Sequence, residues 1–193
     1  NTVVPMFCAE MDGIQSLLET VVILATNRPD LIDPAVIRPG RIDRKIKVSR
    51  PNREESKAIL RVYLKDGLPR EHEDFDAMAE PFLERLFDNS SEQEVLVLTL
   101  RSGGTKKLYW KDFISGAVIE GIMKRAKERA IERAIQGETL CMTVEDLVVS
   151  LETEFQEGSL LPAESNMEDW LQLLDMESKN VVRVRKPNES DKA

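Results

Sequence analysis

The chain has 193 residues, a formal net charge of −8 at pH 7 and 41% hydrophobic residues. Binding to nucleic acids or anionic membranes requires clustered positive charge, so we expect neither as a partner. No apolar run approaches the ~18 residues of a membrane-spanning helix. His72 is the only histidine, which excludes a zinc site of the His-Glu-x-x-His kind. Cys8 and Cys141 lack metal-ligand spacing, and we expect two reduced thiols.

The segment that follows residue 20 carries most of the functional information. Residues 21–25 have the length and β-branching of a strand buried on both faces of a parallel sheet. Asn27 follows at the carboxyl end of this strand, where ligands bind in open α/β sheets, so we expect its side chain to face a ligand. The next loop presents arginines from a frame stiffened by prolines: Arg28, Arg38, Arg41 and Arg44. Guanidinium groups suit phosphate oxygens, but pairing with surface carboxylates fits the spacing equally well.

This segment contains Ala-Thr-Asn-Arg-Pro-Asp, then Ile-Asp-Pro-Ala, then Arg-Pro-Gly-Arg-Ile-Asp-Arg. The ordered pattern resembles the second region of homology of AAA-type ATPases. The resemblance implies that Asn27 is the sensor-1 residue that helps to orient the attacking water. It implies that Arg38 and Arg41 are arginine fingers that reach the nucleotide of the neighbouring subunit in a homo-hexameric ring. Residues 3–13 resemble the helix that follows the Walker B strand.

Two motifs of such ATPases do not occur in this sequence. There is no Gly-x-x-x-x-Gly-Lys-Ser/Thr loop to hold the phosphates, and no apolar strand ending in Asp-Glu precedes Asn1. We therefore expect the chain to begin inside an ATPase domain of a longer protein. ATP and Mg²⁺ are the implied cofactors, with the Mg²⁺ ligands upstream and no metal ligand in this chain. We expect this piece alone to be inactive.

A strand and a helix are predicted next. Residues 45–48 alternate charged and apolar side chains, as in a strand with one solvent-exposed face. Asn52 and Glu55 have the spacing of a capping box, and residues 54–65 follow as a helix that Gly67 ends.

Three lid positions are candidates for nucleoside binding. Ile59, Val62 and Tyr63 share a face of the predicted helix, and the ordinary interpretation is a buried core. In AAA proteins the corresponding helix borders the adenine, which makes Tyr63 a candidate contact. The positions that match Gly116 and Ala117 lie against the adenine in this family, where small residues leave room for the base.

The middle of the chain predicts a helix followed by a hairpin. Residues 75–87 have helical periodicity, and Pro81 predicts a kink or a late start. Two β-favouring runs, 95–100 and 106–110, flank a glycine-bearing turn. This hairpin and the Trp-Lys-Asp-Phe segment that begins at Trp110 resemble the bacterial proteasome-associated ATPases, the Mpa or ARC family.

The last part predicts two more helices and a short strand. Ser115 caps a helix that reaches about Gln136, and Thr143 with Asp146 caps another that reaches about Gln156. Residues 181–185 favour a strand, and 187–193 have the composition of a disordered tail. Basic side chains cluster on the exposed face of the first helix. We expect them to be solvated or to pair with an acidic neighbouring subunit. They are Lys124, Arg125, Lys127, Arg129 and Arg133.

The sequence thus predicts a truncated α/β AAA+ ATPase. Residues 1–50 form the C-terminal part of the large subdomain, 51–158 a mainly helical lid with an inserted hairpin at about 94–110, and 159–193 an extension and tail. The resemblance implies a cytoplasmic unfoldase that feeds tagged protein substrates to a proteasome core particle. The alternatives are a Cdc48-type chaperone and a non-catalytic assembly fragment.

Overall fold

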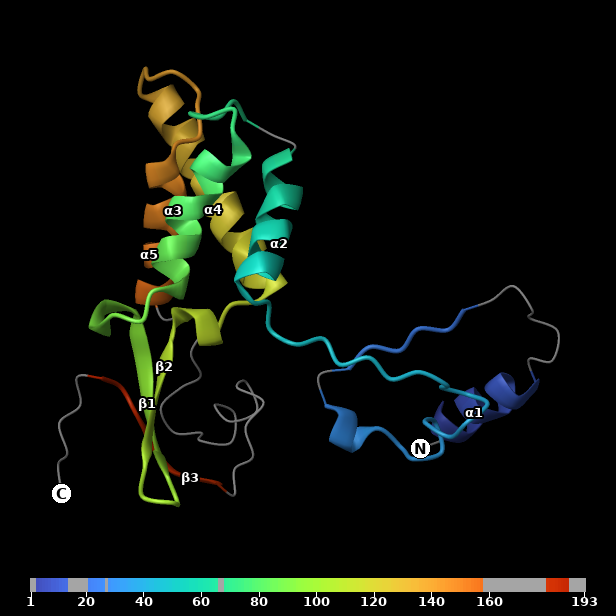
Figure 1. Cartoon of the computed structure of the whole chain (residues 1–193). Coiled ribbons are helices and arrows are strands. Elements are labelled where there is room, and N and C mark those ends of the chain that lie inside the picture. Colours follow the sequence, from blue (N-terminus) through green and yellow to red (C-terminus); the bar gives the residue numbers. More distant parts are fainter. Residues whose placement is uncertain (1–2, 14–20, 27, 66–67, 158–179, 188–193) are drawn as a thin grey trace. The chain divides into compact units, whose positions relative to one another are not determined.

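The computed structural model describes residues 3–13, 21–26, 28–65, 68–157 and 180–187. The chain forms two compact units, Asn1–Ser49 and Arg50–Ala193. In the first unit the described regular elements are α1 (Val3–Gly13) and the short 3-10 turn η1 (Pro29–Leu31). Figure 1 shows the elements of the second unit: α2 (Arg53–Lys65), α3 (Phe75–Phe87), η2 (Ser91–Gln93), β1 (Glu94–Leu100), β2 (Thr105–Tyr109), η3 (Trp110–Asp112), α4 (Gly116–Ile135), α5 (Val144–Gln156) and β3 (Val181–Arg185).

Both strand predictions for the first unit are wrong. Among its described residues neither 21–26 nor 45–48 pairs in a sheet. Their apolar side chains face solvent, with exposed fractions of 82% for Val21, 84% for Ile23 and 89% for Val48. A buried strand needs neighbouring strands to satisfy its backbone N–H and C=O groups, and the described part of this unit supplies none.

In the second unit α2, α3, α4 and α5 enclose a common apolar core. α2 packs against α3 and α4, and α5 packs against the same two helices (Figure 1). Helix α3 begins directly after its N-cap Asp74 and continues through Pro81, so the helix does not start late. Fully buried side chains from every helix fill the interior, including Leu60, Phe82, Ile119, Ile122, Leu147 and Leu151.

The capping box at the start of α2 is confirmed. The Asn52 amide donates to the Glu55 carboxylate at 2.8 Å, and the Glu55 amide donates to Asn52 Oδ1 at 3.0 Å. The predicted core face of this helix is partly wrong, because Val62 is 64% exposed. The buried stripe is Ser56, Leu60 and Leu64, four residues apart, since α2 is covered from two sides by α3 and α4.

The strands form an antiparallel sheet in the order β2-β1-β3, in which Val97 lies between Lys107 and Arg185. Gly103 has φ +86° in the turn between β1 and β2, a conformation that glycine adopts without strain. Trp110 fastens the sheet to the helices, because its ring stacks on Phe155 with centroids 4.9 Å apart.

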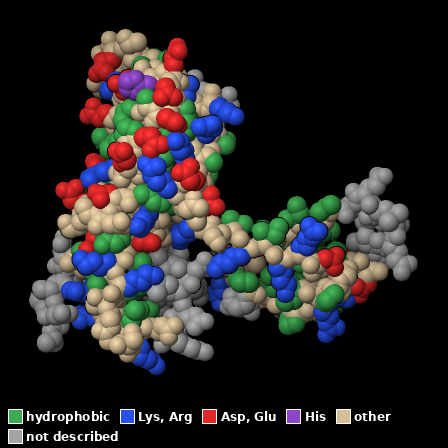
Figure 2. Space-filling view, in the orientation of Figure 1, with side chains coloured by type: hydrophobic (Ala, Val, Ile, Leu, Met, Phe, Trp, Pro, Cys, Tyr) green, Lys and Arg blue, Asp and Glu red, His purple; other side chains and the backbone are tan. Residues whose placement is uncertain are grey.

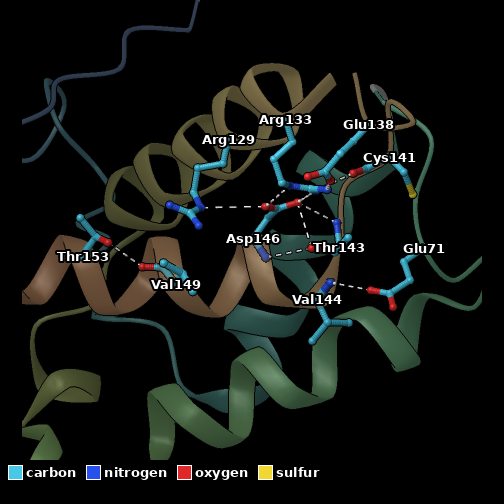
Figure 3. A network of polar contacts seen from close by, with 10 residues as sticks. All are labelled: Glu71, Arg129, Arg133, Glu138, Cys141, Thr143, Val144, Asp146, Val149 and Thr153. Carbon is cyan, nitrogen blue, oxygen red and sulfur yellow. Dashed lines mark hydrogen bonds and ion pairs between the residues drawn. The ribbon is translucent and has the colours of Figure 1, made fainter. Parts of the chain in front are cut away.

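A buried carboxylate joins α4 to α5 (Figure 3). Asp146 is only 3% exposed and accepts from Arg133 Nη2 at 2.5 Å and from the Thr143 amide at 2.9 Å. Arg133 also donates to the Cys141 carbonyl at 3.0 Å, which fixes the segment between the two helices.

Arg125 of α4 pairs with Glu157 at 2.9 Å. Arg133 and Arg125 are therefore neutralised within the chain, and the predicted solvated basic face is wrong for them.

The pH dependence of stability should contain a contribution from Asp146. Burial raises the pKa of this carboxyl, but hydrogen bonds from Arg133 and Thr143 lower it below its ordinary value. A carboxyl with a lower pKa in the folded state stabilises the fold fully above about pH 5, and this stabilisation declines below about pH 4 and is lost as the pH falls through the lowered pKa of the folded state. We expect Asp146→Asn to reduce the free energy of unfolding by about 2 kcal/mol at pH 7.

Urea denaturation followed by circular dichroism between pH 3 and pH 7 measures this effect. The difference between wild type and variant should be constant above about pH 5 and shrink at lower pH. Glu145→Gln is the matched control, because this neighbouring carboxylate is exposed, and it should change little. A deficit for Asp146→Asn that is equal at pH 3 and pH 7 would contradict the assignment.

Candidate functional site

The arginine loop of the first unit is built from its own short-range hydrogen bonds. The Asp33 carbonyl accepts from the Val36 amide at 2.9 Å, and the Asp33 carboxylate accepts from the Ala35 amide at 2.8 Å. Gly40 has φ +88°, a left-handed conformation that would strain a larger residue. The Arg41 amide donates to the Arg38 carbonyl at 3.1 Å, so this glycine turn holds the two arginines in a fixed spacing.

Arg41 is anchored inside the unit. Its Nε donates to Asp12 Oδ1 at 2.8 Å and its Nη2 to Asp12 Oδ2 at 2.5 Å, and Nη1 donates to the Ala35 carbonyl at 2.5 Å. The side chain is 15% exposed, against 60% for Asp12. The hydrogen bond from Arg41 lowers the pKa of the Asp12 carboxyl. A bidentate pair of this kind fixes the plane of a guanidinium as well as its position.

Arg38 has the opposite environment. It is exposed, and among the described residues its side chain makes no hydrogen bond or ion pair. An exposed guanidinium on a fixed turn is available to an anion outside the unit. Asn27, the predicted sensor, lies outside the described residues. Asp12 was not singled out from the sequence, because an acidic residue at the end of a helix gives no local sign of a distant arginine partner.

The lid candidates lie on α2 and α4 of the second unit. Tyr63 is half-buried, and burial together with the nearby Glu120 carboxylate raises the pKa of its phenol. Glu120 is one turn along α4 from Gly116, so Tyr63 lies close to the start of that helix. A Cβ placed on Gly116 would meet no atom within 4 Å, and Ala117 is exposed. The first turn of α4, capped by Ser115, therefore leaves room for a larger group at Gly116.

The chain divides between two known families at the boundary of its two units. Residues 1–50 match the ATPase family associated with various cellular activities (AAA), and residues 51–193 match the ARC, AAA+ ATPase lid domain. Since the second match covers most of the chain, the chain belongs to the ARC branch of the AAA+ ATPases.

Relatives named "Proteasome-associated ATPase" are similar over 96% of this chain. The identity is 38% with those of Acidimicrobium ferrooxidans and Streptomyces griseus and 37% with that of Thermomonospora curvata. The matched part is 34% of the first relative and 33% of the other two. The chain thus spans about a third of the length of these curated relatives. No helix among the described residues is both long and apolar enough to cross a membrane.

The anchoring of Arg41 predicts an unusual titration of Asp12. In the 193-residue chain the Asp12 carboxyl should titrate below its ordinary pKa, because the hydrogen bonds from Arg41 stabilise the carboxylate. Arg41→Gln should return the pKa toward about 3.9. Carbon-detected NMR of the side-chain carboxyl over an acidic pH series measures both. Arg38→Gln is the matched control and should leave Asp12 unchanged; an equal response to both variants would contradict the pairing.

Proposed function

We propose that this chain is the C-terminal part of a ring-forming ATPase that unfolds tagged proteins and delivers them to a proteasome core particle. Family membership over the whole chain and the name of its relatives support this function. The observation that carries the proposal is the exposed Arg38 on a turn whose second arginine is anchored by Asp12. Such a turn suits a guanidinium that acts on a neighbouring subunit of a homo-hexamer.

The proposed catalytic residues have different roles at the γ-phosphate. Arg38 contacts the phosphate oxygens of the nucleotide in the next subunit and stabilises the charge that develops there. Arg41, held by Asp12, fixes the loop and directs its remaining N–H groups toward the same interface. Asn27 orients the attacking water. ATP would supply the phosphoryl group, and Mg²⁺, where bound, would offset the negative charge of its phosphates; no residue of this chain is assigned as its ligand.

The lid is proposed to hold the nucleoside end of ATP. The Tyr63 ring contacts the adenine, while Gly116 and Ala117 leave space for the base. The open space at Gly116 and the half-buried phenol at Tyr63 are consistent with an apolar, planar ligand.

The parts of the chain then have separate tasks in the ring. Residues 1–50 belong to the large subdomain, 51–158 to the lid, and 159–193 to an extension. The β1–β2 hairpin is an insertion in this lid, which an ordinary helical lid lacks. We place the protein in the cytoplasm.

The 193-residue chain alone should not hydrolyse ATP. It has no Gly-x-x-x-x-Gly-Lys-Ser/Thr loop, and the lid contacts cannot replace a phosphate cradle. Steady-state phosphate release should equal that of a sample without protein. Release above this background that Asn27→Ala abolishes would contradict the expectation.

In the longer protein Arg38→Ala should leave nucleotide binding in place and reduce turnover by about 10³-fold, because arginine fingers contribute at least this factor. Lys45→Ala, which removes a nearby exposed positive charge, is the control and should stay within about twofold. Phosphate release at saturating ATP measures turnover. The fluorescence of a labelled ATP analogue measures nucleotide binding.

The same variant tests whether Arg38 acts between subunits. Mixing it with a variant whose own nucleotide pocket is inactive should restore part of the turnover, because some interfaces then combine an intact pocket with an intact arginine. Mixed rings of verified composition that remain inactive would contradict action on the neighbour.

A further inference from the structure

A hollow of about 320 Å³ lies at the junction of the helices and the sheet in the second unit. We call it the basic pocket. The segment just before α2 (residues 50–52), the end of α3, β2 and η3 form its walls. Its cationic lining residues are Arg50, Lys106 and Lys111, and its apolar lining includes Phe87 and Leu108.

The positive charges of Lys106 and Lys111 are not balanced by ion pairs among the described residues. Among the described residues Lys106 makes no ion pair, and the Lys111 ammonium lies over the Tyr109 ring, 5.8 Å from its centroid. Asp112 is the one acidic residue among the described lining, and its carboxylate accepts from the Tyr109 backbone amide at 2.8 Å.

Other basic side chains near the pocket are paired with carboxylates. Lys107, next to Lys106 in the sequence, pairs with Glu94 at 2.7 Å. Arg85 of α3 pairs with Glu152 at 2.8 Å and with Glu92 at 3.0 Å. On the face shown in Figure 2, acidic and basic side chains are mixed over the helices, whereas the charged side chains over the sheet are mostly basic. The basic pocket is therefore a local positive site on a chain whose net charge is −8.

The walls of the pocket are held in place. Arg50 Nη1 donates to the Phe113 carbonyl at 2.7 Å, which joins the start of the unit to the segment after η3. Asp112 caps the turn that carries Lys111, and β1 fixes Lys106 opposite Leu98. The pocket therefore needs little rearrangement to accept a ligand, which favours binding.

The adjacent sheet edge indicates what kind of ligand fits. In the order β2-β1-β3, strand β2 is an edge among the described strands, and Lys106 and Leu108 of this strand line the pocket. An edge strand offers unpaired backbone N–H and C=O groups to an extended peptide, and side chains of such a peptide enter neighbouring pockets. We propose that the basic pocket binds an acidic, extended peptide segment of a partner protein, with a carboxylate between Lys106 and Lys111 and an apolar side chain against Phe87.

Fluorescence anisotropy on the purified 193-residue chain tests this proposal. The probe is a fluorescein-labelled peptide of alternating Glu, Thr and Val residues, and the reference peptide has Gln in place of each Glu. We expect the Glu peptide to bind, the Gln peptide to bind at least about tenfold more weakly, and added salt to weaken the binding.

Two double variants that remove the same charge separate the pocket from general electrostatics. Lys106→Ala with Lys111→Ala should weaken binding of the Glu peptide by about tenfold or more, because two charged contacts are lost. Lys107→Ala with Lys124→Ala should change it by less than about twofold, because in the structure these lysines pair with Glu94 and Glu128. Circular dichroism confirms that both variants are folded.

Three results would overturn the proposal. The first is no binding of the Glu peptide by the wild-type chain. The second is an equal loss in both double variants, which would show attraction by overall charge. The third is binding of inorganic phosphate, seen as NMR shifts at Lys106 and Leu108, without binding of the peptide; the pocket would then be a site for small anions.

Discussion

A β-strand is stable only where its backbone N–H and C=O groups find partners, and this constraint separates the two units of the chain. In the second unit β1 pairs with β2 on one side and with β3 on the other. In the first unit the segments 21–26 and 45–48 have no such partners among the described residues. The strands of the second unit are therefore paired, whereas among the described residues the unit that carries the arginine loop has no paired strand.

The arginine loop shows how one short sequence gives two different side-chain environments. Arg38 and Arg41 are three residues apart, on either side of Gly40, yet Arg41 is held by two hydrogen bonds to Asp12 and Arg38 is exposed. Holding one guanidinium rigidly reduces the freedom of the turn that carries the other. A preorganised donor needs less reorganisation when charge develops on a phosphate, which is the chemistry that we propose for Arg38.

The sequence predicted those features that depend on local signals. The capping boxes of α2 and α5 and the Ser115 cap of α4 are set by residues three positions apart, so helix positions could be predicted closely. The contacts between distant positions could not. Arg41 and Asp12 are 29 positions apart, and Arg133 and Asp146 are 13 apart, on different helices. The two strand predictions for the first unit failed because composition shows β-propensity but not the presence of a neighbouring strand. The roles of Asn27, Arg38 and Arg41 came from an ordered motif, and their chemistry stays a prediction.

Amide hydrogen exchange on the 193-residue chain tests most directly the claim that the second unit forms a paired sheet while the segments 21–26 and 45–48 remain unpaired. Protection reports which backbone amides are held in stable hydrogen bonds. We predict strong protection in the helices α2 to α5 and in β1, together with exchange near the rate of an unstructured peptide at 21–26 and 45–48. Comparable protection in those two segments would show that they pair within this chain and would contradict the account.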